Sequence, residues 1–272
     1  MAKLSDEEIH SILDEMDHLF DEDDSVVFIR VEPDADGNDE IIIGHDIPSI
    51  SSVPDHIEVN SRDAPFRVKV KVAKSEGIQF DIGKPGEKHL AQQYTSSDSG
   101  LSGTMIVDEN NFWGTLTISL DFIEIELMRS GRTIHSCKGN SPMFISNSHV
   151  MDRVDMDINF NSEPLGKCKC LFNLNARDCV DFGYADWTNQ LIPNNYWRVY
   201  TPPRSGKKKE IENVAKTYRG QRVYKWGART GLTSGTVGSP TTLRVPGYKA
   251  RHRCRKANYT SNSGDSGSAV LT

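Results

Sequence analysis

The feature that most constrains the fold is a series of short β-type segments that fills the chain from residue 96 to its end. These segments alternate with turns and show almost no helical periodicity. Examples are Met143–Ser146, Val180–Ala185 and Gln221–Trp226. Many short strands at this spacing are typical of a β-sandwich or of paired β-barrels, and they argue against a helical or doubly wound fold.

The first 95 residues have a different pattern. A capping-box sequence followed by apolar residues at helical spacing predicts an amphipathic helix over residues 5–20. Two β-rich runs, 26–31 and 40–43, flank a turn and predict a hairpin, and strict alternation from Phe66 predicts a half-buried strand. We therefore expect a small α+β region over residues 1–95, followed by a mainly β remainder.

Composition excludes several classes of protein. With 36% hydrophobic and 26% charged residues, the chain has no apolar run near the ~18–20 residues that a membrane helix needs. The first 24 residues carry ten carboxylates and one lysine, unlike a secretory leader. The net charge of −6 argues against a nucleic-acid partner. The basic runs Arg204–Lys209 and Arg251–Lys256 are interpreted as a solvated loop and as the outward positions of a strand.

The cysteines favour a reducing compartment. Their number is odd and their density is too low for a disulfide scaffold, so we predict free thiols and an intracellular protein. The five are Cys137, Cys168, Cys170, Cys179 and Cys254. The Cys168-Lys169-Cys170 sequence could ligate a metal, but it lacks a second pair of ligands, so no metal or cofactor is predicted.

The segment Gly264-Asp-Ser-Gly-Ser-Ala269 resembles a loop built around a nucleophilic serine, Ser266. A serine hydroxyl becomes reactive when an imidazole takes its proton and a carboxylate orients that imidazole. His149 follows an apolar segment that ends in small polar residues, and Asp181 opens an alternating segment. The glycines permit a tight turn, in which the amides of Gly264 and Ser266 could converge on an oxyanion. Other carboxylates near Asp181 remain alternatives: Asp155, Asp157, Asp178 and Asp186.

These segments, in the order His, Asp, Ser, resemble the trypsin-like serine proteases of the chymotrypsin double β-barrel fold. The matching segments are "ISNSHVM", "VDFGYA", "KWGARTGLTSGTV" and "GDSGSAV". Over residues 97–272 the pattern is most similar to an intracellular branch found in bacteria, fungi and plants, which has a strand like Gly100–Asp108 and an upstream segment like Ile47-Pro48. An apparent insertion, Trp113–Lys138, and a short His-to-Asp spacing depart from the family pattern.

The resemblance implies a serine endopeptidase that acts on polypeptides. It divides the chain into an N-terminal region (1–95), a first barrel with His149 and Asp181 (96–190) and a partial second barrel with Ser266 (191–272). Only six residues follow Ser266. We therefore expect a fragment that lacks the C-terminal strands. The alternative is a non-catalytic binding or regulatory module with a protease-like fold.

The resemblance also bears on specificity. Relatives that cleave after Lys or Arg carry an aspartate six residues before the nucleophile, and in this chain that position is Thr260. A neutral hydroxyl does not offset a buried cation, so we predict an apolar or small polar side chain before the scissile bond. The sequence does not define an oligomeric state.

Overall fold

The computed structural model describes residues 3–20, 23, 25–46, 53–60, 65–75, 83–87, 102–129, 131–139, 142–160, 162–173, 181–188, 198–200, 208–211, 213–244 and 251–272. Several residues named above lie outside these ranges: Ile47, Pro48, Gly100, Asp178, Cys179 and residues 204–207 of the first basic run.

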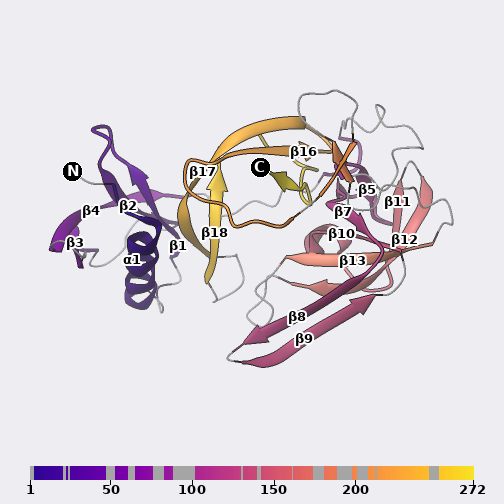
Figure 1. The fold of residues 1–272 in the computed structure, drawn as a ribbon, viewed down its shortest axis with the longest axis horizontal. Helices are drawn as coiled ribbons and strands as arrows, with labels where there is room; N and C mark the ends of the chain where they lie inside the picture. The colour runs from indigo at the N-terminus through magenta and orange to yellow at the C-terminus, as the bar shows by residue number, and fades with distance from the viewer. Residues whose placement is uncertain are drawn as a thin grey trace. The chain divides into compact units, whose positions relative to one another are not determined.

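The protein is mainly β, as predicted (Figure 1). The elements are α1 (Asp6–Leu19), β1 (Val26–Pro33), β2 (Asp39–His45), β3 (His56–Asn60), β4 (Pro65–Lys74), β5 (Met105–Val107), β6 (Trp113–Thr115), β7 (Ile118–Leu120), β8 (Ile123–Arg129), β9 (Arg132–Gly139), β10 (Met143–Ser146), α2 (Ser148–Met151), β11 (Asp157–Phe160), β12 (Glu163–Phe172), β13 (Phe182–Trp187), β14 (Arg198–Tyr200), β15 (Lys208–Glu210), β16 (Arg222–Gly227), β17 (Gly231–Arg244), β18 (Arg251–Ala257) and β19 (Val270–Leu271). Neither helix of the described residues combines the length and the apolarity needed to cross a membrane.

The chain divides into two compact units that are not continuous in sequence. Unit 1 comprises Met1–Gln79, Lys216–Gln221 and Thr236–Asn258, and unit 2 comprises Phe80–Ala215, Arg222–Gly235 and Tyr259–Thr272. These limits differ from the division expected from the sequence, because part of β17 and all of β18 belong with the N-terminal region.

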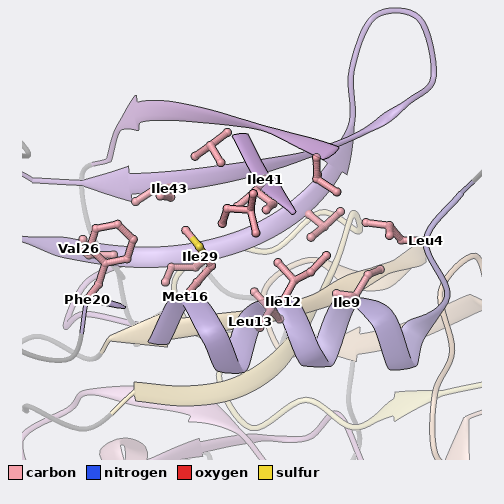
Figure 2. Close-up of a cluster of buried hydrophobic side chains, with 14 residues drawn as sticks. Leu4, Ile9, Ile12, Leu13, Met16, Phe20, Val26, Ile29, Ile41 and Ile43 are labelled. Atoms are coloured by element: carbon pink, nitrogen blue, oxygen red, sulfur yellow. The ribbon is translucent and has the colours of Figure 1, made fainter. Parts of the chain in front are cut away.

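Helix α1 forms the core of unit 1 together with the sheet. Ser5 and Glu8 form the predicted capping box: Glu8 N donates to Ser5 Oγ at 3.2 Å and Ser5 N donates to Glu8 Oε2 at 2.8 Å. The buried face of the helix carries Ile9, Ile12, Leu13 and Met16, which point toward β1 and β2 (Figure 2). The amphipathic pattern of the sequence therefore locates one side of this core.

The sheet of unit 1 combines strands from the N-terminal and C-terminal parts of the sequence. The predicted hairpin is present, with β1 antiparallel to β2, and β2 is extended by β4 and β3. On its other side, β1 pairs with β17, with Phe28 opposite Leu243, and β17 pairs with β18. A lone hairpin is marginally stable, so these two C-terminal strands complete the sheet that α1 covers.

The second basic run forms β18, and its arginines pair with the acidic face of α1. Arg253 contacts Asp14 at 2.6 Å and Asp17 at 2.9 Å, and Arg255 contacts Asp6 at 2.7 Å. These cations therefore act within unit 1, where they neutralise part of the acidic N-terminal sequence.

Unit 2 contains a sheet that curls on itself. Its strand order is β6-β5-β11-β12-β13-β10-β7. The two strands at the ends of this order, β6 and β7, are consecutive in the chain. Between them, the amide of Leu116 donates to Thr104 O and the amide of Thr117 donates to Ile145 O, so the linking residues bond to both ends of the sheet. The expected continuous segment Trp113–Leu127 is therefore divided between β6, β7 and β8, since the chain changes pairing partners twice. Such closure removes sheet edges and encloses a core.

Apolar side chains fill the inside of this curled sheet. Phe144, Ile106, Leu116 and Ala185 are fully buried there. Unit 2 also contains the hairpin β8–β9, the antiparallel pair β14–β15 and the pairing of β16 with β17 and β19.

Candidate active site

His149 lies in the single-turn helix α2, directly after strand β10. The apolar strand Met143–Ser146 is buried between β7 and β13, and the small polar residues Asn147 and Ser148 let the chain turn out of the sheet. The imidazole is thereby delivered at the end of a rigid strand, with its side chain 18% exposed.

Asp181 lies directly against His149. Strand β13 pairs with β10 so that Gly183 is opposite Ser146, which places the residue before β13 beside α2. The Oδ2 atom of Asp181 is 2.5 Å from Nδ1 of His149 and accepts a hydrogen bond from Asn147 Nδ2 at 2.7 Å. The Oδ1 atom accepts from Ser148 Oγ at 2.7 Å and from the backbone amide of His149 at 3.1 Å.

This hydrogen bonding determines the charge of Asp181. Burial acts to raise its pKa, but the hydrogen bonds and charge of His149, with those of Asn147 and Ser148, outweigh burial and lower the pKa to about 2. The carboxylate is therefore ionised near neutral pH. An ionised carboxylate at Nδ1 favours the tautomer with the proton on that atom, which leaves the Nε2 lone pair for proton transfer.

The structure places the described alternative carboxylates elsewhere. Asp186 lies toward the other end of β13, opposite Met143. Asp155 and Asp157 form ion pairs with Lys169 at 3.7 Å and with Lys167 at 3.4 Å. Of the candidates within the described residues, Asp181 is the one that contacts the imidazole.

The loop around Ser266 is fixed by hydrogen bonds to the last residue of β6 and to the segment that follows it. Thr115 donates twice, from its amide to Ser266 O at 2.7 Å and from Oγ1 to Gly264 O at 2.8 Å. Thr117 Oγ1 donates to Gly267 O at 2.5 Å. Backbone carbonyls on both sides of Ser266 are thus held, while its side chain is half-buried.

Both glycines of the loop meet a structural requirement. Gly264 has φ +94° and Gly267 has φ +91°, in the region that side chains rarely adopt. A Cβ atom on Gly264 would collide with the ring of Trp113, and one on Gly267 would collide with Thr115 O. Glycine is therefore needed at both positions for this close packing.

The buried side chain of Asp265 holds the Ser266 loop in place. This side chain is fully buried and forms an ion pair with Lys225 Nζ at 2.7 Å, and Lys225 is only 3% exposed. Thr230 donates from Oγ1 at 2.7 Å and from its amide at 3.1 Å, and the amides of Arg229 and Asn262 donate at 3.1 Å each. Burial acts to raise the pKa of Asp265, but the hydrogen bonds from Lys225 and Thr230 outweigh it and lower the pKa.

Sequence reasoning missed Lys225 and Thr230. The signal was a lysine at an apolar position of the alternating segment "RVYKWG", where Val223 is buried. A lysine in a strand interior is rarely buried without a carboxylate partner, so the pattern called for a buried acid.

The Ser266 loop and α2 meet at Gly114 in β6. A Cβ atom on Gly114 would lie 2.6 Å from the methyl groups of Val150, the residue after His149, and 3.1 Å from Ser266 O. Ser146 Oγ donates to Thr115 O at 2.8 Å, which connects the end of β10 to the same segment. No hydrogen bond joins the Ser266 hydroxyl to the ring of His149 in the described part of the chain.

The amides proposed for the oxyanion lie in this loop. The Asp265 amide bonds to Asn262 O and the Ser268 amide to Asp265 O, whereas no backbone acceptor among the described residues takes the amides of Gly264 or Ser266. Thr260 is exposed and accepts a hydrogen bond from Thr233 Oγ1 at 3.2 Å. Its role in a substrate pocket remains a prediction.

The cysteines require a correction. Cys137 and Cys170 form a disulfide between β9 and β12, with Cα atoms 6.5 Å apart, so the prediction of free thiols is wrong for this pair. The strands bring together residues that lie 33 positions apart, which the sequence alone did not reveal. His135 lies beside the pair, and the three side chains form the one group within the described residues with metal-ligand types gathered closely. Cys168 and Cys254 are free thiols, and burial raises their pKa to about 12 and about 11.

Comparison with known proteins found similarity in structure only. No protein-family profile and no curated protein sequence matches the chain. Among solved structures, the chain is similar to a glutamic acid-specific serine protease (20% identity, 63% of this chain and 79% of that one, TM-score 0.45). It is also similar to Protease A of Thermobifida fusca (18%, 64% and 77%, TM-score 0.45) and to a Nocardiopsis protease (16%, 64% and 78%, TM-score 0.44).

Proposed function

We propose that this chain is a serine endopeptidase with Ser266 as nucleophile, His149 as general base and Asp181 as the carboxylate that orients the imidazole. The observation that carries the proposal is the contact of Asp181 with Nδ1 of His149, made by a carboxylate whose pKa is about 2. The Ser266 loop belongs to the same compact unit and is bonded to the strand against which α2 packs.

The chemistry follows from these positions. Ser266 Oγ attacks the peptide carbonyl carbon while His149 Nε2 takes its proton, and the negative charge of Asp181 stabilises the imidazolium. The amides of Gly264 and Ser266 donate to the oxyanion of the tetrahedral intermediate. His149 then protonates the leaving amine, and a water activated in the same way hydrolyses the acyl-enzyme.

The anchoring of Asp265 supports this assignment. An oxyanion site works when its donors are held in place before the reaction, because no reorganisation is then needed at the transition state. The Gly264 and Ser266 amides flank Asp265, whose carboxylate takes five hydrogen bonds from four residues. The loop is thus pre-formed by contacts other than those of the reacting groups.

Covalent labelling tests the proposal. A fluorophosphonate probe reacts with an activated serine, and intact mass and peptide mapping identify the site. We expect one label on Ser266, loss of labelling in Ser266→Ala, and slower labelling in His149→Ala and Asp181→Asn. Ser263→Ala is the matched control in the same loop and should label normally. Absence of labelling in protein that circular dichroism shows to be folded would instead support a non-catalytic module.

Specificity and location are further parts of this proposal. Thr260 predicts cleavage after apolar or small polar residues, and a peptide library digest dominated by cleavage after Lys or Arg would contradict it. Intracellular action requires Cys137 and Cys170 to persist as thiols there, because disulfides are rare in reducing compartments. Alkylation of the protein in intact cells, followed by mass spectrometry, distinguishes the thiol pair from the disulfide.

A further inference from the structure

A proline in β17 opens the sheet of unit 1. The ladder between β1 and β17 runs from Phe28–Leu243 to Arg30–Thr241. The next position of β17 is Pro240, which has no amide hydrogen and cannot continue the ladder as a donor. Beyond this point β1 continues along β2, whereas β17 continues along β18 with a register shift.

A groove of about 500 Å³ lies where these strands separate. Its walls are the end of β1 and residues 236–239 of β17, and residues 219–220 and the end of β18 contribute to it. All of its lining residues belong to unit 1. We call it the cationic groove, because its charged residues are Lys3, Arg30, Arg219 and Lys256, with Glu32 as the single carboxylate.

Part of this charge is held in place by the fold. Arg219 binds both oxygens of Asp39 at 2.6 and 3.1 Å, and Asp39 is 2% exposed. Asp39 also accepts from the amide of Leu4 at 2.8 Å, which fixes the backbone next to Lys3. Burial acts to raise the pKa of Asp39, but the hydrogen bonds from Arg219 and Leu4 outweigh it and lower the pKa, so this pair stays charged.

Other donors of the groove are available to a ligand. The side chains of Lys3 and Lys256 are exposed. Arg30 Nε lies 3.0 Å from Glu32 Oε1, so this guanidinium already has a carboxylate partner. Lys3 and Lys256 are therefore the cations of the groove that an incoming carboxylate can reach.

We propose that the cationic groove binds an acidic segment of a partner polypeptide. The positive charge contrasts with the chain's net charge of −6 and matches carboxylates. The volume suits a few residues, and Val31, Pro33 and Val237 offer apolar contacts to a peptide between its charges. No aromatic side chain lines the groove within the described residues, so the stacking surface that single-stranded nucleic acids use is missing there.

This inference goes beyond the proposed protease activity and does not depend on it. The groove belongs to unit 1, whereas His149, Asp181 and Ser266 belong to unit 2. Binding is therefore measured on the full chain carrying Ser266→Ala, so that the probe peptide stays intact whether or not the chain is a protease.

Fluorescence anisotropy tests the proposal with a labelled hexapeptide of alternating Glu and Val. We expect binding that weakens with salt and is lost when Gln replaces Glu. The double variant Lys3→Ala/Lys256→Ala should raise Kd at least about tenfold, which corresponds to ~1.4 kcal/mol. The matched control is Arg67→Ala/Lys69→Ala, which removes two exposed charges of β4 in the same unit and should change Kd less than about twofold.

Three outcomes would overturn the proposal. The first is equal weakening by the groove and control variants, which would mean that overall charge alone attracts the peptide. The second is equal binding of the Glu and Gln peptides. The third is tighter binding of an oligonucleotide of the same charge, which would assign the groove to nucleic acid. Lys256→Glu provides a second measure of the same site and should weaken Glu-peptide binding further than Lys256→Ala.

Discussion

Replacing Lys225 by Met tests how the Ser266 loop is held. The variant removes the cation but keeps the length of the side chain, and it leaves the buried Asp265 carboxylate with the donors of Thr230, Arg229 and Asn262. Breaking a buried ion pair by removing one partner costs about 3–5 kcal/mol, because the remaining charge stays in a low-dielectric site. We expect about 3 kcal/mol, the lower end, since four hydrogen bonds to Asp265 remain.

Urea unfolding followed by tryptophan fluorescence measures the loss of stability in unit 2, which contains the Ser266 loop. All four tryptophans, Trp113, Trp187, Trp197 and Trp226, fall within the sequence ranges of unit 2. With a slope of about 2–3 kcal/mol per molar urea, the midpoint should fall by roughly 1–1.5 M. Labelling of Ser266 should slow in parallel, because the amides beside Asp265 lose their fixed position.

Two further variants serve as controls for the loss of the buried ion pair. Lys138 pairs with Glu124 at the surface of the same unit, with both side chains about half exposed, so Lys138→Met should cost at most about 1 kcal/mol. The double variant Lys225→Met/Asp265→Asn should lose less stability than the sum of its single changes, because no unpaired charge is left. A midpoint for Lys225→Met that matches the Lys138→Met control would show that the buried pair does not hold the loop.

Three other predictions follow from the same unit. Gly264→Ala should lower the free energy of unfolding by about 2–5 kcal/mol and abolish labelling, because it adds backbone strain and a collision with Trp113; a normal urea midpoint would contradict this. The pKa of Asp181 is lowered to about 2, so its stabilisation, about 2 kcal/mol, is complete above about pH 4 and is lost as pH falls to about 2. Wild type should therefore be more stable to unfolding than Asp181→Asn at pH 5, and the two unfolding free energies should agree at pH 2. A difference between the two proteins that is the same at both pH values would refute the assignment. Reducing the Cys137–Cys170 disulfide should cost about 3–4 kcal/mol from the entropy of its 33-residue separation, and an unchanged urea midpoint after reduction would show that the bond adds no stability.

Local patterns in the sequence predicted local structure well. The capping box and apolar spacing located α1 to within one residue, and the segment Met143–Ser146 matches β10. The alternating segment before Asp186 gave β13, but it did not decide which aspartate meets His149. That choice depends on the β10–β13 register, which is a property of two strands and not of either segment.

Contacts between distant segments account for what the sequence did not reveal. Lys225 meets Asp265 across 40 positions, and Cys137 meets Cys170 across 33. Neither pair has a periodic signal, since each depends on how strands are ordered in a sheet. The two compact units differ from the expected ranges for the same reason, because the second half of β17 pairs with β1.

The discontinuous sheet of unit 1 has a consequence for protein synthesis. Arg255 and its partner Asp6 are 249 positions apart. At a synthesis rate of 5–20 residues per second, about 12–50 s therefore pass between the synthesis of Asp6 and that of Arg255. During that time β1 has no β17 beside it, and an unpaired strand edge can associate with other chains. We expect nascent chains stalled before β17 to depend on chaperones, and release from that dependence to coincide with the emergence of residues 236–258 from the ribosome.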